Sequence, residues 1–377
     1  MSVNKLHLAL WDRKLPSYEE FTNLPWKERL EIFVWLGHMA PSSHNTQPWR
    51  FYCDPDNKTL VVFLDRALVL PESDVVGREA VISLGCAIEN IVTAADGYGQ
   101  STTVKTHHVK REILRPRQEK LEIGKELIPF ATLKFAEGVS SSSSLVLTQA
   151  MLTRKVMRAE FDPNIQIEER VLEELQQSIT DETTELHLIH DSIRKLSISE
   201  FQGQADSYVL NSPRFAGELG DWLLSNDTAS ATGMPGNTFG FDDEQAGRIS
   251  SGLRGESKLE PEDMLKFSLG GKIGFEKSPT IAFITISTDD VPEWIAAGRA
   301  MERAFLILER EGISFAVHAA IVEVRLINRI FAATLGTFKP LAAVFRIGHV
   351  KDAASKISRP HSPRQPLSAV LLPQLPD

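Results

Sequence analysis

Residues 41–51, Pro-Ser-Ser-His-Asn-Thr-Gln-Pro-Trp-Arg-Phe, combine hydroxyl and amide side chains with a proline near each end. Pro41 and Pro48 remove backbone donors and restrict the residues before them, so this segment cannot continue a helix. It is expected to present backbone N–H groups and short polar side chains at a fixed corner, with Trp49 and Phe51 as apolar anchors. Such a corner suits hydrogen bonding to the edge of a flat polar heterocycle. We call residues 41–49 the corner.

A pair of arginines further along the chain could bind a phosphate. Residues 147–161 predict a helix that stops at the Asp-Pro pair 162–163, with Arg154 and Arg158 four residues apart on one face. Two guanidinium groups converging from one face fit a phosphate dianion, because Arg binds it through a planar fork. Lys155 lies beside this face of the predicted helix. The alternative is a solvated basic patch that pairs with surface acids.

Regular elements are predicted on both sides of the corner. An amphipathic run at 26–39 precedes it and predicts a helix. Two short apolar segments, 50–52 and 60–64, follow it and predict a β-hairpin with a turn at 54–58. A long helix is predicted at 78–96. The corner should therefore join a helix to a hairpin.

The 78–96 helix has a second copy near the C-terminus. Four residue types recur at a constant offset of 213 positions: Ile82, Gly85, Ala87 and Glu89 match Ile295, Gly298, Ala300 and Glu302. Gly99 matches Gly312 at the same offset. Predicted strands at 281–286 and 341–347 flank the second copy. A period this long indicates duplicated domains rather than a solenoid.

The repeat divides the chain into two halves, which we place at 1–140 and 141–377. The serine run at 140–144 is expected to be a flexible linker between them. Residues 225–258 are rich in Gly, Ser, Asn and Asp, and a long irregular insertion in a compact domain is usually a lid or a disordered loop. Its apolar residues need covering, which favours a lid.

Composition excludes several classes of function. The chain has 377 residues, 42% of them hydrophobic and 24% charged, as in a soluble globular protein. A formal charge of −9 argues against a nucleic-acid partner, which would need a clustered basic surface. The two cysteines are too few for a disulfide framework and lack metal-ligand spacing, so no metal is expected. No signal-peptide pattern or membrane-length apolar run occurs, so a cytoplasmic protein without a membrane partner is expected.

The corner resembles the signature of the nitroreductase-type flavoproteins, in which a Pro-Ser-Ser-x-Asn-x-Gln-Pro-Trp segment lies against FMN. The resemblance runs without a gap through seven residues: Pro41, Ser42, Ser43, Asn45, Gln47, Pro48 and Trp49. It implies that Ser43 and Asn45 hydrogen-bond the flavin or its ribityl chain, with Gln47 in the same site. Pro41 and Ser42 would shape the turn. The alternative is an ordinary helix-to-strand turn, in which Ser, Asn and Pro are common.

Residues 152–161 resemble the opening of a nitroreductase domain, in which an Arg-x-Ser/Thr-x-Arg run holds the FMN phosphate. This chain departs from that pattern at the middle position, where Val156 replaces the hydroxyl residue. The C-terminal stretch 359–367 resembles the basic tail that closes over the same phosphate. Together the two stretches imply five phosphate-binding cations: Arg154, Lys155, Arg158, Arg359 and Arg364.

Each half of the chain holds what the other half lacks. Nitroreductases are usually dimers whose FMN sites combine the corner of one subunit with the arginines of the other. Here the first half has the corner without the arginines, and the second half has the arginines without the corner. The resemblance therefore implies an α+β nitroreductase fold in two tandem halves, an intrachain pseudo-dimer with one composite FMN site. The insertion is similar to that of the fused Acg-type nitroreductase-like proteins.

The implied activity is that of an FMN-dependent oxidoreductase. NADH or NADPH would donate two electrons, and a small electrophile such as a nitro compound or quinone would accept them. No catalytic side chain is expected, because such acceptors can take protons from water. The alternative is an FMN storage or sequestering protein with a closed lid and little turnover. A deiodinase-like or flavin-destructase-like activity on the same fold, and further pairing into a homodimer, also stay open.

Overall fold

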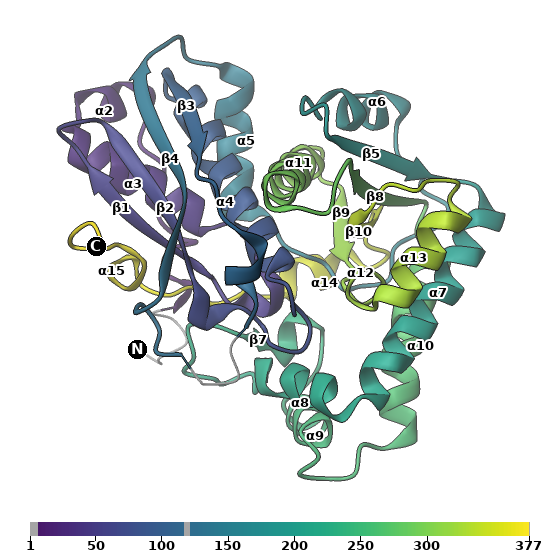
Figure 1. The fold of residues 1–377 in the computed structure, drawn as a ribbon. Helices are drawn as coiled ribbons and strands as arrows, with labels where there is room; N and C mark the ends of the chain where they lie inside the picture. The colour runs from purple at the N-terminus through teal and green to yellow at the C-terminus, as the bar shows by residue number, and fades with distance from the viewer. Residues whose placement is uncertain (1–6, 117–120, 377) are drawn as a thin grey trace.

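The computed structural model describes residues 7–116 and 121–376, and a four-stranded antiparallel sheet organises its first half (Figure 1). The strands are β1 (Trp49–Asp54), β2 (Thr59–Asp65), β3 (Gln100–Thr106) and β4 (Leu127–Glu137), in the order β1-β2-β4-β3. Trp49 pairs with Leu64 in the β1–β2 hairpin, which confirms the predicted hairpin. β1 begins at the last residue of the corner.

The second half repeats this topology. Its sheet contains β5 (Thr184–Ile189), β8 (Thr280–Ile286), β9 (Ser314–Val317) and β10 (Leu341–Gly348), in the order β5-β8-β10-β9. All the strand pairs are antiparallel, as in the first sheet. Each strand therefore has a counterpart at the same place in the other sheet. The predicted α+β fold is confirmed.

Two long helices, α4 (Arg78–Gly97) and α11 (Val291–Arg310), pack against each other between the sheets (Figure 1). A Cβ on Gly85 would lie 2.4 Å from the carbonyl oxygen of Ile295, and a Cβ on Gly298 would lie 2.0 Å from that of Ile82. These contacts are reciprocal, because both pairs are related by the 213-residue offset seen in the sequence. Reciprocal contacts of this kind are produced by a two-fold axis.

α4 is long and apolar enough to cross a membrane by length and composition. In the structure, however, 89% of its most apolar 18-residue window is buried inside the protein. Its apolar character is explained by this central position.

Helices α2 (Tyr18–Asn23) and α3 (Trp26–His38) precede the corner, and α3 confirms the helix predicted there. Ser17 and Glu20 form a reciprocal capping box at the start of α2. The serine run does not form the expected flexible linker. It opens α5 (Ser142–Thr153), because the Ser141 side chain accepts from a backbone N–H of the first turn.

The helix predicted at 147–161 is wrong at its C-terminal end, since α5 stops at Thr153. The next residues, 154–161, form an extended segment, named here the arginine segment. Val156 forms an isolated parallel bridge with Phe315 of β9, and the Met157 N–H donates to the Phe315 carbonyl at 2.7 Å. Pairing with a strand edge has therefore replaced helix continuation.

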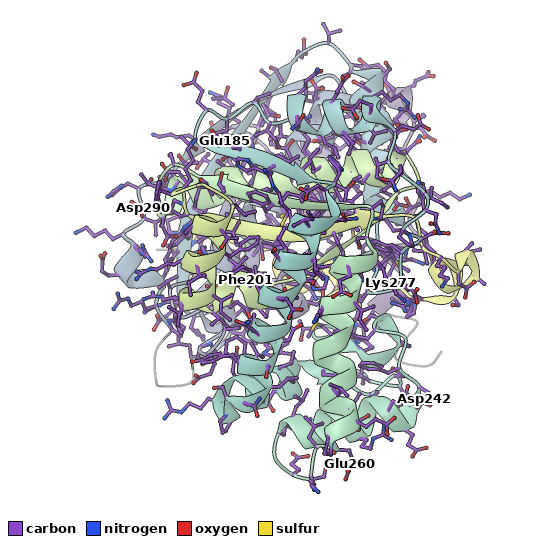
Figure 2. All side chains as sticks on the ribbon, turned by 90° about the vertical axis from the view of Figure 1, so that its right-hand side faces the viewer. Glu185, Phe201, Asp242, Glu260, Lys277 and Asp290 are labelled. Atoms are coloured by element: carbon purple, nitrogen blue, oxygen red, sulfur yellow. The ribbon has the colours of Figure 1, made fainter. Side chains whose placement is uncertain are left out.

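The second sheet contains an insertion at the place of the first hairpin turn. Between β5 and β8 the chain forms α7 (Ser192–Asn211), α8 (Pro213–Trp222), β6 (Leu223–Leu224), β7 (Met234–Pro235), α9 (Asp243–Leu253) and α10 (Pro261–Lys277). Figure 2 shows α7 and α10 running side by side away from the sheet, with Lys277 near it and Glu260 at the far end. The stretch expected to be an irregular insertion thus includes α9.

The remaining helices complete the second half. They are α6 (Glu169–Gln177), α12 (Ala320–Glu323), α13 (Arg325–Thr334) and α14 (Ala353–Ser358). After α14 the chain returns to the first half, where α15 (Leu367–Val370) lies beside β1 (Figure 1). The Leu372 N–H donates to the Phe51 carbonyl at 2.8 Å, which fastens this C-terminal tail to the first sheet.

Candidate functional site

The corner has an unusual backbone. Three of its residues have positive φ angles without being glycine: His44 at 47°, Asn45 at 57° and Gln47 at 54°. Only one other non-glycine residue of the described chain, Lys58, shares this property. Left-handed conformations cost side-chain-bearing residues free energy, and such residues cluster at functional sites where the surrounding structure holds them.

Asn45 is held by the tail and by the insertion. Its Nδ2 donates to the carbonyl of Gly233 at 2.9 Å and to that of Pro363 at 3.0 Å. Its Oδ1 accepts from Nη1 of Arg364 at 2.7 Å. The side chain therefore joins three parts of the chain that are distant in sequence. Its contact with a flavin stays a prediction.

Gln47 has the same kind of role and is fully buried. Its Nε2 donates to the Ala231 carbonyl at 2.8 Å, and its Oε1 accepts from the Gln365 N–H at 2.9 Å. Both amides thus connect the corner to the insertion and to the tail. Gln47 is the predicted site residue that lines neither of the cavities described below.

Gln47→Met should lower the free energy of unfolding by about 1–3 kcal/mol, because it leaves the Ala231 carbonyl and the Gln365 N–H buried without a partner. Chemical denaturation measures this loss, and hydrogen exchange should become faster at the backbone N–H groups of Arg364 and Gln365. Gln176→Met, at an exposed position of α6, is the control and should change stability by less than about 0.5 kcal/mol. Unchanged exchange of the tail in Gln47→Met would contradict the anchoring role.

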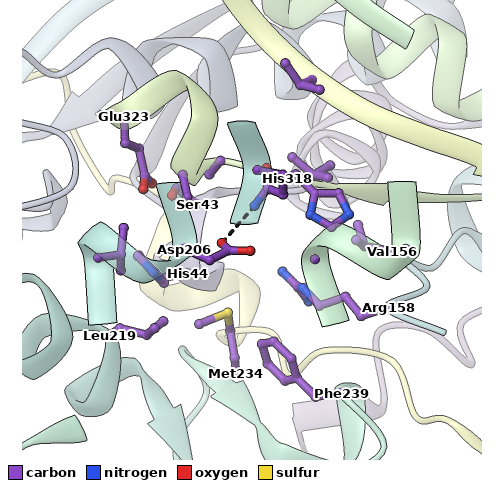
Figure 3. Close-up of a pocket in the computed structure, with 18 of the residues that line it drawn as sticks. Ser43, His44, Val156, Arg158, Asp206, Leu219, Met234, Phe239, His318 and Glu323 are labelled. Atoms are coloured by element: carbon purple, nitrogen blue, oxygen red, sulfur yellow. Dashed lines mark hydrogen bonds between the residues drawn. The ribbon is translucent and has the colours of Figure 1, made fainter. Parts of the chain in front are cut away.

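A cavity of about 700 Å³ opens beside the corner. Its walls come from the corner, the arginine segment, the β9–α12 region and the insertion. Figure 3 shows Ser43 and His44 on one side of it, with Val156 and Arg158 opposite. The lining is mostly apolar, and the volume falls in the range of small-molecule and cofactor sites.

A second, smaller cavity of about 70 Å³ adjoins the first one. Five residues line both cavities: Pro41, Ser42, Val156, Arg158 and Met234. The smaller cavity collects all five of the cations expected to bind phosphate: Arg154, Lys155, Arg158, Arg359 and Arg364. The fold thus brings the arginine segment and the basic tail together at one end of the corner.

Two of these arginines are fixed by the protein itself. Arg364 donates to the carbonyls of His38 at 3.0 Å and Ala40 at 2.9 Å, where α3 ends. Arg154 donates to the Met39 carbonyl at 2.6 Å and pairs with Glu302 of α11 at 3.2 Å. Cations are favourable at a helix C-terminus. These two side chains therefore position the corner as well as line the cavity.

The other two arginines lack such partners. Among the described residues, neither Arg158 nor Arg359 pairs with a carboxylate. Arg158 lies over the ring of Phe239 at 4.4 Å, and Nη1 of Arg359 is 3.5 Å from the Thr238 carbonyl. Burial and the nearby Arg359 lower the pKa of Arg158 to about 10. Two facing cations without a counter-ion form a site for an anion.

Several polar residues of the larger cavity were missed by sequence reasoning. They are Glu79, Asp206, His318, Glu323 and Arg346. Four of them lie in four different helices and strands, and His318 lies in the loop after β9. They have no motif spacing, so the sequence carried no signal for them. The sequence did not decide whether His44 faces solvent or the site. The structure places it in the wall of this cavity, with its Nδ1 buried without a hydrogen-bond partner.

The ionisable groups of this cavity are strongly perturbed. Burial raises the pKa of Asp206 and that of Glu79 to about 7. Burial, with Arg346 nearby, lowers the pKa of His318 well below its usual value. Arg346 donates to Nε2 of His318 at 3.1 Å, which favours the neutral imidazole. Perturbed groups of this kind in a cavity are typical of functional sites.

Comparison with known proteins identifies a relative that matches nearly the whole chain. No protein-family model matches the sequence. The chain is 22% identical over 341 residues to the "Putative NAD(P)H nitroreductase acg" of Mycobacterium tuberculosis, covering 89% of this chain and 93% of that protein. A second protein of that organism, the "Putative NAD(P)H nitroreductase Rv3131", is 35% identical over 83 residues, or 22% of this chain and 24% of its own.

Solved structures give lower similarity. The FMN-dependent nitroreductase NfnB of Mycobacterium smegmatis, in complex with NADPH, is 14% identical with a TM-score of 0.39, covering 60% of this chain and 97% of its own. A nitroreductase with bound FMN from Bacteroides fragilis is 14% identical with a TM-score of 0.33, and the match covers 55% of this chain and 89% of that protein. The sequence similarity to the acg protein extends through both halves and includes nearly all of each chain. The chain is thus similar to nitroreductase-type proteins over nearly its whole length.

Proposed function

We propose that this protein is an FMN-dependent oxidoreductase, with NADH or NADPH as the donor and a small electrophile, such as a nitro compound or quinone, as the acceptor. The observation that carries the proposal is the junction of two unlike cavities at the corner. A large apolar cavity suits a flat ring system, and the small cationic cavity beside it suits a phosphate. FMN has both groups, joined by a polyol chain.

The residues present fit this ligand. Arg158 and Arg359 have no carboxylate partner among the described residues, and a phosphate dianion would supply the missing charge. Lys155 lines the same cavity, although its Nζ already donates to the Arg359 carbonyl at 2.8 Å. Ser42 lines both cavities and would lie along the polyol chain. Val156 has no hydroxyl to offer, so the arginines must carry the phosphate contacts.

When bound, FMN supplies two-electron redox chemistry, and the protein supplies binding, orientation and electrostatics. Ser43 and His44 would face the ring from the corner side, and Arg346 from the opposite wall. Nη1 of Arg346 is buried without a hydrogen-bond partner, so its charge is available to an electron-rich edge of the ligand. The apolar residues Met234 and Phe239 of the insertion would exclude water.

A second candidate function is storage or sequestration of FMN under a closed lid. Asn45 and Gln47 favour it, because they bind Gly233 and Ala231 of the insertion directly to the corner. A flavin in this cavity would be covered for as long as these hydrogen bonds hold. The 225–258 lid would then control access of a nicotinamide to the ring.

The absorption spectrum of the purified protein, before and after anaerobic NADH or NADPH, tests both functions. About one flavin per chain, bleached by a nicotinamide, supports the oxidoreductase and the single composite site. Flavin that resists both nicotinamides but is reduced by dithionite supports sequestration. A protein that holds no flavin and takes up none from added FMN would contradict both.

Arg158→Ala should weaken FMN binding by about 1.5–3 kcal/mol, which corresponds to roughly 10- to 150-fold in Kd, because one charge-assisted contact to phosphate is lost. Titration monitored by flavin fluorescence measures the change. Riboflavin, which lacks the phosphate, is the matched control ligand, and its affinity should not weaken. Equal losses for the two ligands would place Arg158 away from the phosphate.

A further inference from the structure

We propose that Glu323, held in place by Glu79, is the acid that protonates the bound acceptor during its reduction. This inference rests on the proposed function, because it names the proton donor for the same cavity. It also replaces the expectation that acceptors take their protons from water alone.

Glu79 and Glu323 come from opposite halves of the chain. Glu79 lies in the first turn of α4, and Glu323 is the last residue of α12. Both line the larger cavity, and Figure 3 shows Glu323 beside Ser43 at its wall. The two carboxyl groups hydrogen-bond each other. An ionised carboxylate can only accept, so this contact requires a proton on one of the pair.

Ser43 favours Glu79 as the ionised member of the pair. Its hydroxyl donates to Oε2 of Glu79 at 2.5 Å, and a hydrogen bond to a carboxylate stabilises its ionised form. Glu323 is then the protonated partner, which donates to Glu79. Glu79 is accordingly a positioning residue, and Glu323 is the residue that can release a proton into the cavity.

The surroundings hold this proton at neutral pH. The charged groups that face the pair are Asp74, Arg78 and Glu218, of which only Arg78 is positive. Burial and the nearby carboxylates raise the pKa of Glu323 well above its usual value, and burial raises that of Glu79 to about 7. Two carboxyl groups this close share one proton.

The chemistry requires one such proton per reduction. A quinone that accepts a hydride from the reduced cofactor gains an electron pair and one proton, and it needs a second proton on oxygen to become a neutral hydroquinone. The O–H bond of Glu323 breaks and the new O–H bond forms on the acceptor. Both carboxyl groups are then ionised, and a proton from water restores the pair. A nitro group reduced by two electrons needs its second proton in the same way.

The test compares Glu323→Gln with the parent protein, both loaded with FMN and reduced by the nicotinamide. Quinone reduction in the variant should be at least 10-fold slower. The parent rate should fall as pH rises through the pKa of the pair, since only the protonated acid can donate, and this decline should vanish in the variant. Ferricyanide, which takes electrons without a proton, should oxidise both proteins at the same rate.

Asp206→Asn is the matched control, because Asp206 is another buried carboxyl group of raised pKa on the same cavity. It should keep the pH dependence of quinone reduction. Equal quinone rates and pH profiles for Glu323→Gln and the parent would overturn the assignment of the acid while leaving the oxidoreductase intact. Equal slowing with quinone and ferricyanide would also overturn it. A parent protein that binds no flavin would instead reject the proposed function.

Discussion

Gly298→Val is expected to lower the free energy of unfolding by about 3 kcal/mol, at the upper end of the usual cost of overpacking. A Cβ at this position would lie 2.0 Å from the carbonyl oxygen of Ile82 and 2.9 Å from the Cα of Gly85. Both neighbouring atoms belong to the backbone of α4, so no side chain can move aside. The central helices must separate, and this loosens packing between the two halves. Chemical denaturation measures the loss.

Gly247→Ala is the matched control for this helix contact. Gly247 is also a helical glycine, but a Cβ there meets nothing within 4 Å. This change should stabilise α9 by about 0.5–1 kcal/mol through helix propensity. The reciprocal contact also predicts that Gly85→Val and Gly298→Val are not additive, because the first substitution already separates the helices. Additive losses would mean that the two glycines act at independent sites.

Arg154→Met should lower the free energy of unfolding by about 3–5 kcal/mol at pH 8, the usual cost of breaking a buried ion pair by removing one partner. The side chain of Arg154 is 3% exposed and that of Glu302 is fully buried. The substitution leaves Glu302 in the centre of α11 without its nearest cation. It also removes a donor from the end of α3, beside the corner. Urea denaturation across a pH series measures the loss.

The pH dependence of this loss follows from Glu302. Burial raises the pKa of Glu302 to about 7, and Arg154 keeps it from rising further. A carboxyl group with a raised pKa in the folded state gives stability that is complete below its unfolded pKa and lost as pH rises. Without Arg154 the pKa of Glu302 rises again, so the deficit should be smaller at pH 5 than at pH 8 and should grow by up to about 1.4 kcal/mol per pH unit from pH 7 to pH 9.

Glu302→Gln in the Arg154→Met background isolates the charge of Glu302. The double variant should be more stable than Arg154→Met at pH 8, because the uncompensated carboxylate is gone. Its stability relative to the parent should also vary less with pH. A deficit in Arg154→Met that is the same at pH 5 and pH 9 would show that packing, rather than the buried charge, is responsible.

The two experiments concern features that the sequence predicted to different degrees. Gly85 and Gly298 belong to a repeat that is visible in the sequence itself, because matching residues at a constant offset requires no knowledge of the folded structure. That these glycines meet each other was decided only by the packing of α4 on α11. Arg154 was recognised by its motif. Its partner Glu302 lies 148 positions away, and the repeat that includes Glu302 gave no sign of this ion pair.

Local patterns failed where long-range pairing competed with them. The arginine segment has helical spacing, but its backbone pairs with β9, and a strand edge offers hydrogen bonds that periodicity cannot predict. The composition of the serine run predicts a linker, but the Ser141 side chain caps the N-terminus of α5 by accepting a hydrogen bond from its first turn. Composition also could not predict that the insertion lies between strands β5 and β8.

The sequence by itself predicted the α+β fold and the two-fold repeat, because these are set by residue types at short or constant spacing. The corner and the five cations were named from their resemblance to a known family, and the strain of the corner backbone was seen only in the structure. The tertiary structure alone decided that the corner and the cations enclose adjoining cavities, that Asn45 and Gln47 bind the chain itself, and that Glu79 meets Glu323. The physical reason is that these contacts join residues from opposite halves. Only burial and packing of the whole chain bring them together.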